Sequence, residues 1–107
     1  MGFQVSLLAS AEQDLKDVCA WIVAQDGPEQ AAAVFDRMEE RILSLESLPE
    51  RGNHPPELER IGVLGFRELH EPPFRIIYQV LGQDVYVHAI LDARRDLQDL
   101  LARRLLR

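Results

Sequence analysis

The sequence predicts an α+β domain in the order β-αα-βββ-α, in which a helical hairpin packs on a small, mostly antiparallel sheet. Two helical patterns follow a short strand, three strand-like runs are separated by short turns, and a leucine- and arginine-rich segment comes last. Strands joined by short turns form an antiparallel meander, and the helical pair must bury its apolar stripes against one face of that sheet. A chain of 107 residues has the size of one domain, so we expect a single domain over residues 1–107.

The chain opens with a predicted strand that leads directly into a helix. Apolar and polar residues alternate over residues 3–7, which is typical of a short strand. Ser10, with Gln13 three residues later, forms a capping-box pattern and predicts that the helix starts at Ala11. The apolar residues of this helix recur at helical spacing on one stripe: Ala11, Leu15, Val18, Cys19 and Ile22.

A second helix is predicted from Pro28 to about Leu48. Gly27 breaks the first helix, Pro28 suits a first helical turn, and Pro49 stops the second helix. Its apolar positions alternate by three and four: Ala31, Phe35, Met38, Ile42 and Leu45. The two helices therefore form an antiparallel hairpin with facing stripes. A coiled-coil dimer is the alternative use of this stripe, and we favour packing within one chain.

Three strands are predicted after a turn-rich connector at residues 49–56. They are expected at residues 66–70, 74–80 and 85–91, and the first strand of the chain is expected at an edge of the same sheet. A turn at Pro72-Pro73 separates the first two of them. Gly82-Gln83 makes a tight hairpin between the last two, because glycine tolerates a positive φ.

The end of the chain predicts a final amphipathic helix in a segment with a net positive charge. Asp92 or Asp96 is expected to cap this helix, and its apolar positions are Leu97, Leu100, Leu101 and Leu105. The whole chain has a net charge of −6, which argues against a general nucleic-acid binder. Residues 1–63 hold five basic against twelve acidic residues, whereas residues 94–107 hold five arginines against two aspartates. We interpret this contrast as two parts of the chain that face different partners, and the alternative is that the acidic helical faces are simply solvated.

Cysteine and histidine usage predicts no metal and no cofactor. The single cysteine, Cys19, excludes an intramolecular disulfide framework and is expected to be an inert core thiol. Three histidines, His54, His70 and His88, lie on different segments without the spacing of metal ligands. The chain also shows neither a membrane span nor a signal-peptide pattern, so a cytoplasmic location is expected.

Four sequence runs, taken in order, resemble the RelE/ParE superfamily of bacterial toxins. They are AEQDL at residues 11–15, LESLPERG at 45–52, FRIIY at 74–78 and RRD at 94–96. The resemblance spans nearly the whole chain and is closer to the ParE branch. It implies a toxin of a type II toxin–antitoxin pair that is held inactive by a protein antitoxin. RelE-like members cut mRNA on the ribosome, whereas ParE-like members poison DNA gyrase.

The resemblance to RelE-like nucleases implies an arginine cluster around the phosphate that is cleaved. Arg75 matches the arginine of the Arg-x-x-Tyr strand that contacts the scissile phosphate in those enzymes, and Arg67 and Arg95 match flanking cations. Guanidinium groups suit bidentate contact with phosphate. The catalytic acid and base are poorly matched, because the only lysine is Lys16 in the first helix and Leu101 stands where those enzymes have a tyrosine.

Other polar residues offer weaker nuclease candidates. Glu68 and His70 alternate to the same face of one strand and could act as a pair, although two solvated side chains beside a turn are the simpler interpretation. His88 lies in the middle of a strand and is discounted in the same way. Tyr78 and Tyr86 are interpreted as packing residues. This branch would require a metal-independent endoribonuclease with a non-standard active site.

The resemblance to ParE-like toxins implies a protein-binding surface instead of a catalytic set. Predicted target-binding residues are arginines and a leucine of the last third of the chain: Arg75, Arg94, Arg95, Leu101, Arg103 and Arg104. Leucine anchors flanked by arginines suit an interface. The alternative is structural: the arginines pair with carboxylates of the toxin or its antitoxin, and the leucines pack on the sheet or bind the antitoxin.

The favoured hypothesis is a non-enzymatic ParE-like toxin that inhibits DNA gyrase and causes growth arrest in plasmid or stress maintenance. A ParD-like antitoxin is the expected partner in a toxin–antitoxin hetero-oligomer, and direct nucleic-acid binding and membrane binding are not expected. The first alternative is a RelE-like ribosome-dependent mRNA endonuclease built around Arg67, Arg75 and Arg95. The second is an inactive family member that acts only as an antitoxin-binding module.

Overall fold

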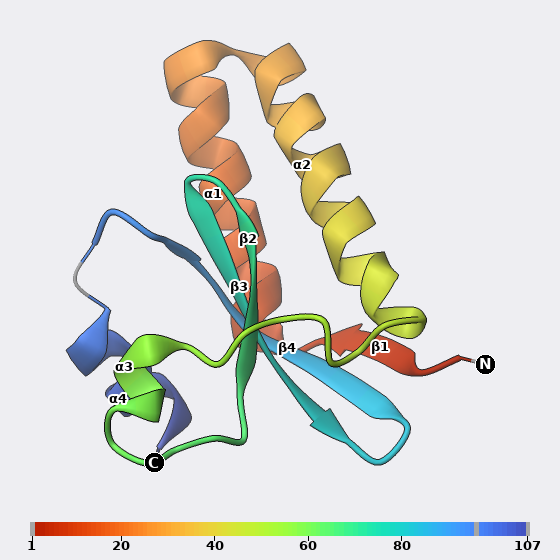
Figure 1. Cartoon of the computed structure of the whole chain (residues 1–107). Coiled ribbons are helices and arrows are strands. Elements are labelled where there is room, and N and C mark those ends of the chain that lie inside the picture. Colours follow the sequence, from red (N-terminus) through yellow and green to blue (C-terminus); the bar gives the residue numbers. More distant parts are fainter. Residues whose placement is uncertain (1, 96, 107) are drawn as a thin grey trace.

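The computed structural model describes residues 2–95 and 97–106, and it has the α+β architecture that the sequence predicts (Figure 1). Its elements, in chain order, are β1 (Gln4–Leu7), α1 (Ala9–Asp26), α2 (Pro28–Leu43), the 3₁₀ helix η1 (Ser44–Glu46), α3 (Pro56–Glu59), β2 (Arg67–Glu71), β3 (Phe74–Leu81), β4 (Asp84–Asp92) and α4 (Gln98–Leu105). The predicted order is confirmed, and the structure adds two short helices, η1 and α3.

One sheet of four strands has the order β1-β4-β3-β2. The pairs β2–β3 and β3–β4 are antiparallel, whereas β1 lies parallel to β4. The predicted edge position of the first strand is therefore confirmed. Gly82 has a φ of 62° in the β3–β4 turn, which explains why glycine stands at the predicted hairpin.

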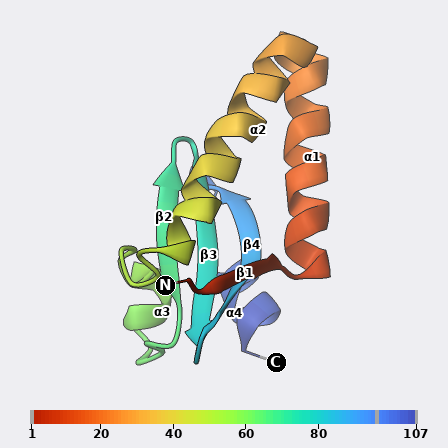
Figure 2. The same cartoon turned by 90° about the vertical axis from the view of Figure 1, so that its right-hand side faces the viewer.

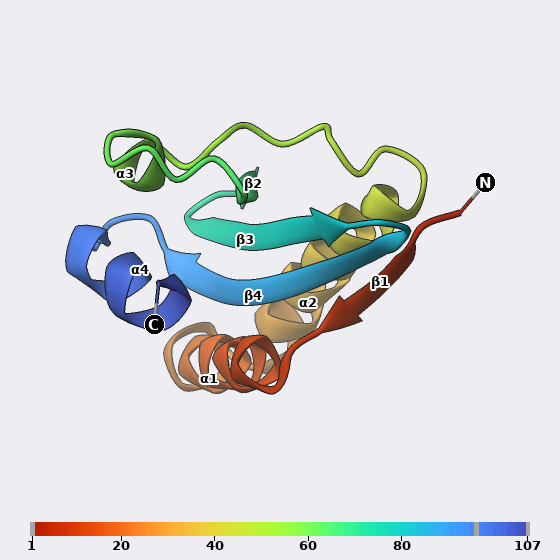
Figure 3. The same cartoon turned by 90° about the horizontal axis from the view of Figure 1, so that it is seen from below.

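Helices cover both faces of the sheet and form two separate apolar cores. The hairpin α1–α2 packs on one face, and α3 and α4 cover part of the other (Figure 3). α3 and α4 both lie at the end of the sheet away from the tip of the hairpin (Figure 2). Most of the predicted stripe is buried in the core under the hairpin, which confirms packing within one chain: Ala31, Met38 and Ile42 of α2, and Leu45 of η1. Val34 is also buried there, whereas Phe35 is exposed.

A shift of register in β4 decides which of its residues face which core. Ile77 is paired with Ala89, and the next residue, Tyr78, is paired with Val87, so that His88 is the extra residue of a bulge. Val87 consequently belongs to the hairpin core, whereas Ala89 belongs to the core under α3 and α4. A strict alternation along β4 would place both on the same face.

The predicted capping box at the start of α1 is wrong. The helix starts at Ala9, and Leu8 at its N-cap makes no side-chain capping bond. The N–H of Leu8 donates to the carbonyl oxygen of Val87 at 3.0 Å, so that the chain turns into the helix directly from β1. The hydroxyl of Ser10 donates instead to the carbonyl oxygen of His88 at 3.1 Å.

The ends of two other helices also differ from the prediction. α2 ends at Leu43 instead of Leu48, because the hydroxyl of Ser44 donates to the carbonyl oxygen of Arg41 at 2.6 Å and the chain tightens into η1. α4 starts at Gln98 after Leu97, without a side-chain cap. Asp92 does not cap it, and the other expected cap, Asp96, lies outside the described residues.

Two further features bear on the sequence predictions. Cys19 is half-buried and lines an open cavity of the hairpin, so the prediction of a core thiol is wrong in its placement. Burial raises the pKa of its thiol, which disfavours the reactive thiolate. None of the helices in the described part of the chain combines the length and apolarity that a bilayer span requires.

Candidate functional site

Arg75 lies on β3 with its guanidinium group buried between two carboxylates. Its terminal nitrogens Nη1 and Nη2 donate to Oε2 and Oε1 of Glu57 at 2.6 and 2.7 Å, and Nε donates to Oε1 of Glu68 at 2.5 Å. The other oxygen of this carboxylate, Glu68 Oε2, accepts a hydrogen bond from Asn53 Nδ2 at 2.8 Å and lies 3.6 Å from His70 Nε2. Glu57 comes from α3 and Glu68 from β2, so this Arg75 cluster joins three elements.

The charge of Arg75 is neutralised by carboxylates of the protein itself. Hydrogen bonding to Arg75 holds the pKa of Glu57 below its ordinary value, and hydrogen bonding to Glu57 raises the pKa of Arg75 further above its already high value. The side chain of Glu68 is 2% exposed, so the expectation that Glu68 and His70 are both solvated is wrong for Glu68. A phosphate could reach Arg75 only by displacing carboxylates that already bind it.

Arg67 is also engaged within the protein. Its Nη1 donates to the carbonyl oxygen of Gly52 at 2.8 Å and to that of Glu50 at 3.3 Å, which anchors the connector on β2. The N–H of Gly52 donates to Tyr78 Oη at 3.0 Å, and Tyr78 is fully buried, as predicted for a packing residue. The three arginines of the nuclease alternative, Arg67, Arg75 and Arg95, therefore contact different groups.

The turn after β4 presents two exposed arginines at a corner of the molecule. Arg94 Nη2 donates to Asp92 Oδ2 at 2.7 Å, its Nε donates to Oδ1 at 3.0 Å, and its backbone N–H donates to the same oxygen at 2.9 Å. This pairing lowers the pKa of Asp92. Arg95 is exposed, and its backbone N–H donates to the carbonyl oxygen of Asp92 at 3.2 Å.

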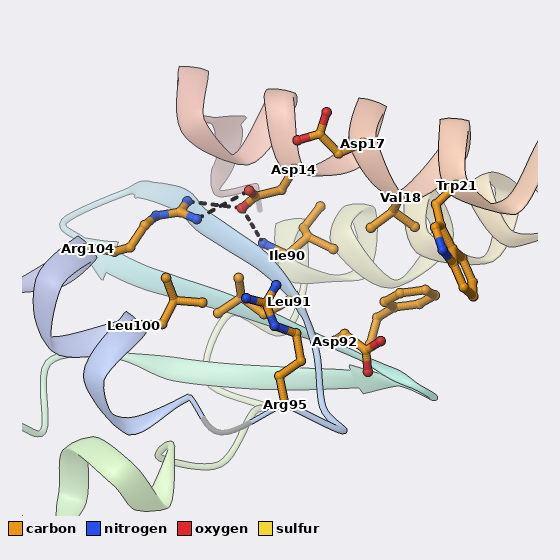
Figure 4. Close-up of a pocket in the computed structure, with 11 residues that line it drawn as sticks. Asp14, Asp17, Val18, Trp21, Ile90, Leu91, Asp92, Arg95, Leu100 and Arg104 are labelled. Atoms are coloured by element: carbon orange, nitrogen blue, oxygen red, sulfur yellow. Dashed lines mark hydrogen bonds and ion pairs between the residues drawn. The ribbon is translucent and has the colours of Figure 1, made fainter.

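A cavity of about 320 Å³ lies beside this corner, between α1, the end of β4 and α4 (Figure 4). Trp21 of α1 lines it and is 51% exposed. Apolar groups of the lining include Val18, Phe74 and Leu100, and the charged groups are Asp14, Asp17, Asp92, Arg95 and Arg104. The cavity therefore combines an apolar wall with charges of both signs.

Asp14 holds α4 against this cavity. Arg104 Nη1 and Nη2 donate to Asp14 Oδ1 and Oδ2 at 3.2 and 3.0 Å, and Nη2 also donates to the carbonyl oxygen of His88 at 3.0 Å (Figure 4 shows the Asp14 contacts). The N–H of Ile90 donates to Asp14 Oδ2 at 3.0 Å. One carboxylate thereby connects α1, β4 and α4.

His88, a discounted nuclease candidate, is also involved in packing. Its ring makes an edge-on contact with Phe66, with centroids 5.2 Å apart, and its Nε2 lies 3.2 Å from Gln79 Oε1. Burial and, to a lesser extent, the charge of Arg104 lower the pKa of its imidazole. His88 therefore supports the bulge of β4 and the end of α4.

The predicted target-binding residues do not share one environment. Arg94, Arg95 and Arg103 are exposed, and Arg104 is half-buried in its contact with Asp14. Leu101 is fully buried in the second core and Arg75 is 7% exposed, so neither side chain is available on the surface of the folded protein. Within the part of the chain that the structure describes, no group of three metal-ligating side chains is arranged to hold an ion.

Sequence reasoning missed Trp21 and Asp17 as residues of this cavity. Both come from α1, 71 or more positions before the corner that they face. The available signal was that Trp21 stands beside the apolar stripe of α1, next to Ile22, and a large aromatic residue outside the stripe is available for contact. Its proximity to Arg95 follows only from the packing of α1 along β4.

The fold that carries these residues is a small sheet with a helical hairpin on one face and an arginine corner after its last strand. A family model described as the ParE toxin of the type II toxin–antitoxin system parDE matches residues 5–97, and the chain belongs to this family.

Solved structures with similar folds come from toxin–antitoxin systems. The chain is 23% identical to a chain of the chromosomal ParDE system from P. aeruginosa, with a TM-score of 0.71 over 84% of this chain and 95% of that chain. It is 19% identical to a chain of the toxin–antitoxin complex RelBE2 from Mycobacterium tuberculosis, with a TM-score of 0.57 over 86% of this chain and 99% of that chain. Among curated proteins, none matches this chain. At these identities the structural likeness concerns the fold.

Proposed function

We propose that this ParE-family protein is a toxin that inhibits DNA gyrase by binding to it, without catalysing a reaction. Membership of the ParE family supports the proposal. The observation that carries it is the contrast between two arginines. Arg75, which a RelE-like nuclease would need at the phosphate, is bound by Glu57 and Glu68, whereas Arg95 is exposed beside a cavity with an apolar wall.

Charge supports a protein target over an RNA target. Binding a phosphate at Arg75 would leave Glu57 and Glu68 facing a polyanion without their counter-charge, and this arrangement is costly in a buried site. The net charge of −6 also opposes electrostatic steering toward the ribosome and its RNA.

A ParD-like antitoxin in the same cytoplasm is the proposed partner. The similar folds from P. aeruginosa and M. tuberculosis come from a ParDE system and from a RelBE2 toxin–antitoxin complex, respectively. A hetero-oligomer with a protein antitoxin is therefore the expected resting state of this toxin.

The test is a comparison of two activities of the purified toxin. We expect it to block supercoiling by DNA gyrase or to trap gyrase-cleaved DNA, and to leave mRNA intact in a translating extract. Added antitoxin should restore supercoiling. Codon-specific cuts in mRNA with unaffected gyrase would contradict the proposal and favour the endonuclease. Expression without growth arrest would favour the inactive antitoxin-binding module.

A further inference from the structure

We propose that the cavity between α1, the end of β4 and α4 is the surface that engages the target, and that the target is a protein segment that supplies one carboxylate and an apolar side chain. We call the lining of this cavity, which includes Trp21 and Arg95, the Trp21–Arg95 surface. The inference rests on the proposed function, because it assumes that the toxin acts by binding a protein.

Trp21 gives this surface an anchor for a partner. It is the only tryptophan of the chain, and half of it remains exposed although α1 has a buried face close by at Ile22. Tryptophan and arginine are the residues most enriched among those that dominate protein–protein affinity. The cavity of about 320 Å³ beside the indole is lined by Val18, Phe74 and Leu100, and an apolar side chain of a partner fits such a wall.

The charges of the lining select an acidic group on that partner. Arg104 is paired with Asp14, and Asp92 is paired with Arg94. Among the described residues, two charged groups of this lining form no ion pair: Arg95, and Asp17, which accepts a hydrogen bond from Gln13 Nε2 at 2.9 Å. A carboxylate of the partner placed beside Arg95 would give it an ion pair, and the two oxygens of a carboxylate match the geometry of a guanidinium group.

The same lining disfavours a nucleic-acid backbone. Its charged groups are three carboxylates and two guanidinium groups, so the lining holds one more negative than positive formal charge. Successive phosphates would meet Asp17 and Asp92, whereas a single carboxylate can approach Arg95 without meeting a second negative charge of its own chain. A protein segment is therefore the occupant that the charges favour.

The surface is formed before any partner binds. Asp14 holds α4 through Arg104, and Leu101 and Leu97 of this terminal segment are buried in the second core. A preformed site avoids the ordering cost that weakens binding by flexible segments. The Trp21–Arg95 surface is thus a preformed patch with one apolar anchor and an exposed guanidinium group.

The experiment uses the full-length toxin and three variants with a matched control. Trp21→Ala removes the anchor, Arg95→Glu reverses the charge, and Arg95→Lys keeps the charge without the planar fork. Arg51→Glu is the control, because Arg51 is an exposed arginine of the connector that lies outside this cavity. Each variant is checked by thermal unfolding, then titrated against gyrase supercoiling and, separately, against the antitoxin.

We expect Trp21→Ala and Arg95→Glu to raise the toxin concentration needed for half-inhibition of gyrase at least tenfold, and Arg95→Lys to raise it less. Arg51→Glu should inhibit like the wild type, and antitoxin affinity should change less than threefold in every variant. Inhibition by Trp21→Ala and Arg95→Glu at wild-type concentrations would overturn the inference. An equal loss of antitoxin affinity would also overturn it, since the surface would then belong to the antitoxin.

Growth arrest separates a failure of this inference from a failure of the proposed function. If the wild type arrests growth but leaves gyrase unaffected, the proposed target is wrong, and the surface is judged by growth arrest alone. Arrest by Trp21→Ala and Arg95→Glu would then overturn the surface, and loss of arrest with retained folding would support it. A wild type that neither arrests growth nor inhibits gyrase overturns both.

Discussion

Arg75 and Arg95 carry the same guanidinium group in opposite surroundings. Arg75 lies within β3 and is 7% exposed, with Glu57 and Glu68 bound to it on two sides. Arg95 lies in the turn after β4, is exposed, and lines a cavity with Trp21. In the sequence the two positions appear equivalent, because each follows the pattern of an arginine that faces a target.

These two arginines show that a matching motif position alone does not determine the role of a cation. The role depends on the carboxylates that surround the guanidinium group. Glu57 reaches Arg75 because α3 interrupts the connector, and Glu68 reaches it from the neighbouring strand. Arg75 thereby becomes a structural contact among α3, β2 and β3, whereas Arg95 at the corner after β4 stays exposed.

The largest expected effect is the loss of stability in Arg75→Ala. Removing the guanidinium leaves Glu68 buried without its counter-charge, which typically costs about 3–5 kcal/mol of the free energy of unfolding. Urea denaturation of the purified toxin measures this quantity. Arg95→Ala is the matched control and should change the same free energy by no more than about 0.5 kcal/mol. Equal stability of the two variants would remove the distinction between the arginines.

A second prediction concerns the contact that positions α4. Asp14→Asn weakens charge-assisted hydrogen bonds to Arg104, and bonds of this kind typically contribute about 1.5–3 kcal/mol. In the variant we expect amide hydrogen exchange in α4 to be faster than in the wild type, and exchange in β3 to stay the same. Mass spectrometry measures both. Asp17→Asn, an exposed neighbour on the same helix, should leave exchange in α4 unchanged. Equal protection of α4 in Asp14→Asn would show that its leucines alone hold the helix.

The third prediction tests how tightly the connector packs on the Arg75 cluster. A methyl group at position 52 would overlap the carbonyl oxygen of Glu68 and the hydroxyl of Tyr78. Gly52→Ala should therefore lower the free energy of unfolding by about 1–3 kcal/mol, as overpacking does in other cores. Gly2→Ala, where a methyl group meets nothing within 4 Å, is the control for thermal unfolding. A neutral Gly52→Ala would indicate a connector that moves freely over β2.

The smallest effect is a dependence of stability on pH that comes from the titration of Glu57 in its ion pair with Arg75. Folding lowers the pKa of Glu57 below its ordinary value of 4.5, so the ion pair with Arg75 contributes fully above pH 4.5 and is lost as the pH falls below it through the folded-state pKa. The stability difference between the wild type and Glu57→Gln should narrow on acidification in that window. Denaturation curves at several pH values check this, and a difference that does not vary with pH would contradict the role given to Glu57.

Much of the fold could be predicted from local patterns. The alternation of residues 3–7, the apolar stripe of α2 and the turn at Gly82 depend on neighbours in the sequence, and each placed its element correctly. The helix ends were predicted less well. Ser10 carried the signal of a cap, yet its hydroxyl binds the carbonyl oxygen of His88, which belongs to a strand 78 positions away.

The candidate site was less predictable because its residues meet across long sequence separations. Arg94, Arg95 and Arg103 were assigned to the surface from their pattern, and the structure leaves them exposed. Leu101 was assigned to the same surface, but the second core needs its side chain. The pattern of a helix with leucines and arginines does not state which leucine faces the sheet when the helix has only eight residues.

Local patterns along the chain predicted the order of the elements and the contrast between an acidic first half and a basic end, and four motifs in order carried the resemblance to the toxin family. These properties follow from composition, periodicity and motifs, which act over a few residues at a time. The binding of Arg75 by Glu57 and Glu68, and the place of Trp21 in the lining that also holds Arg95, depend on the packing of the folded chain. The physical reason is that burial and ion pairing depend on distances between side chains, and packing alone sets those distances.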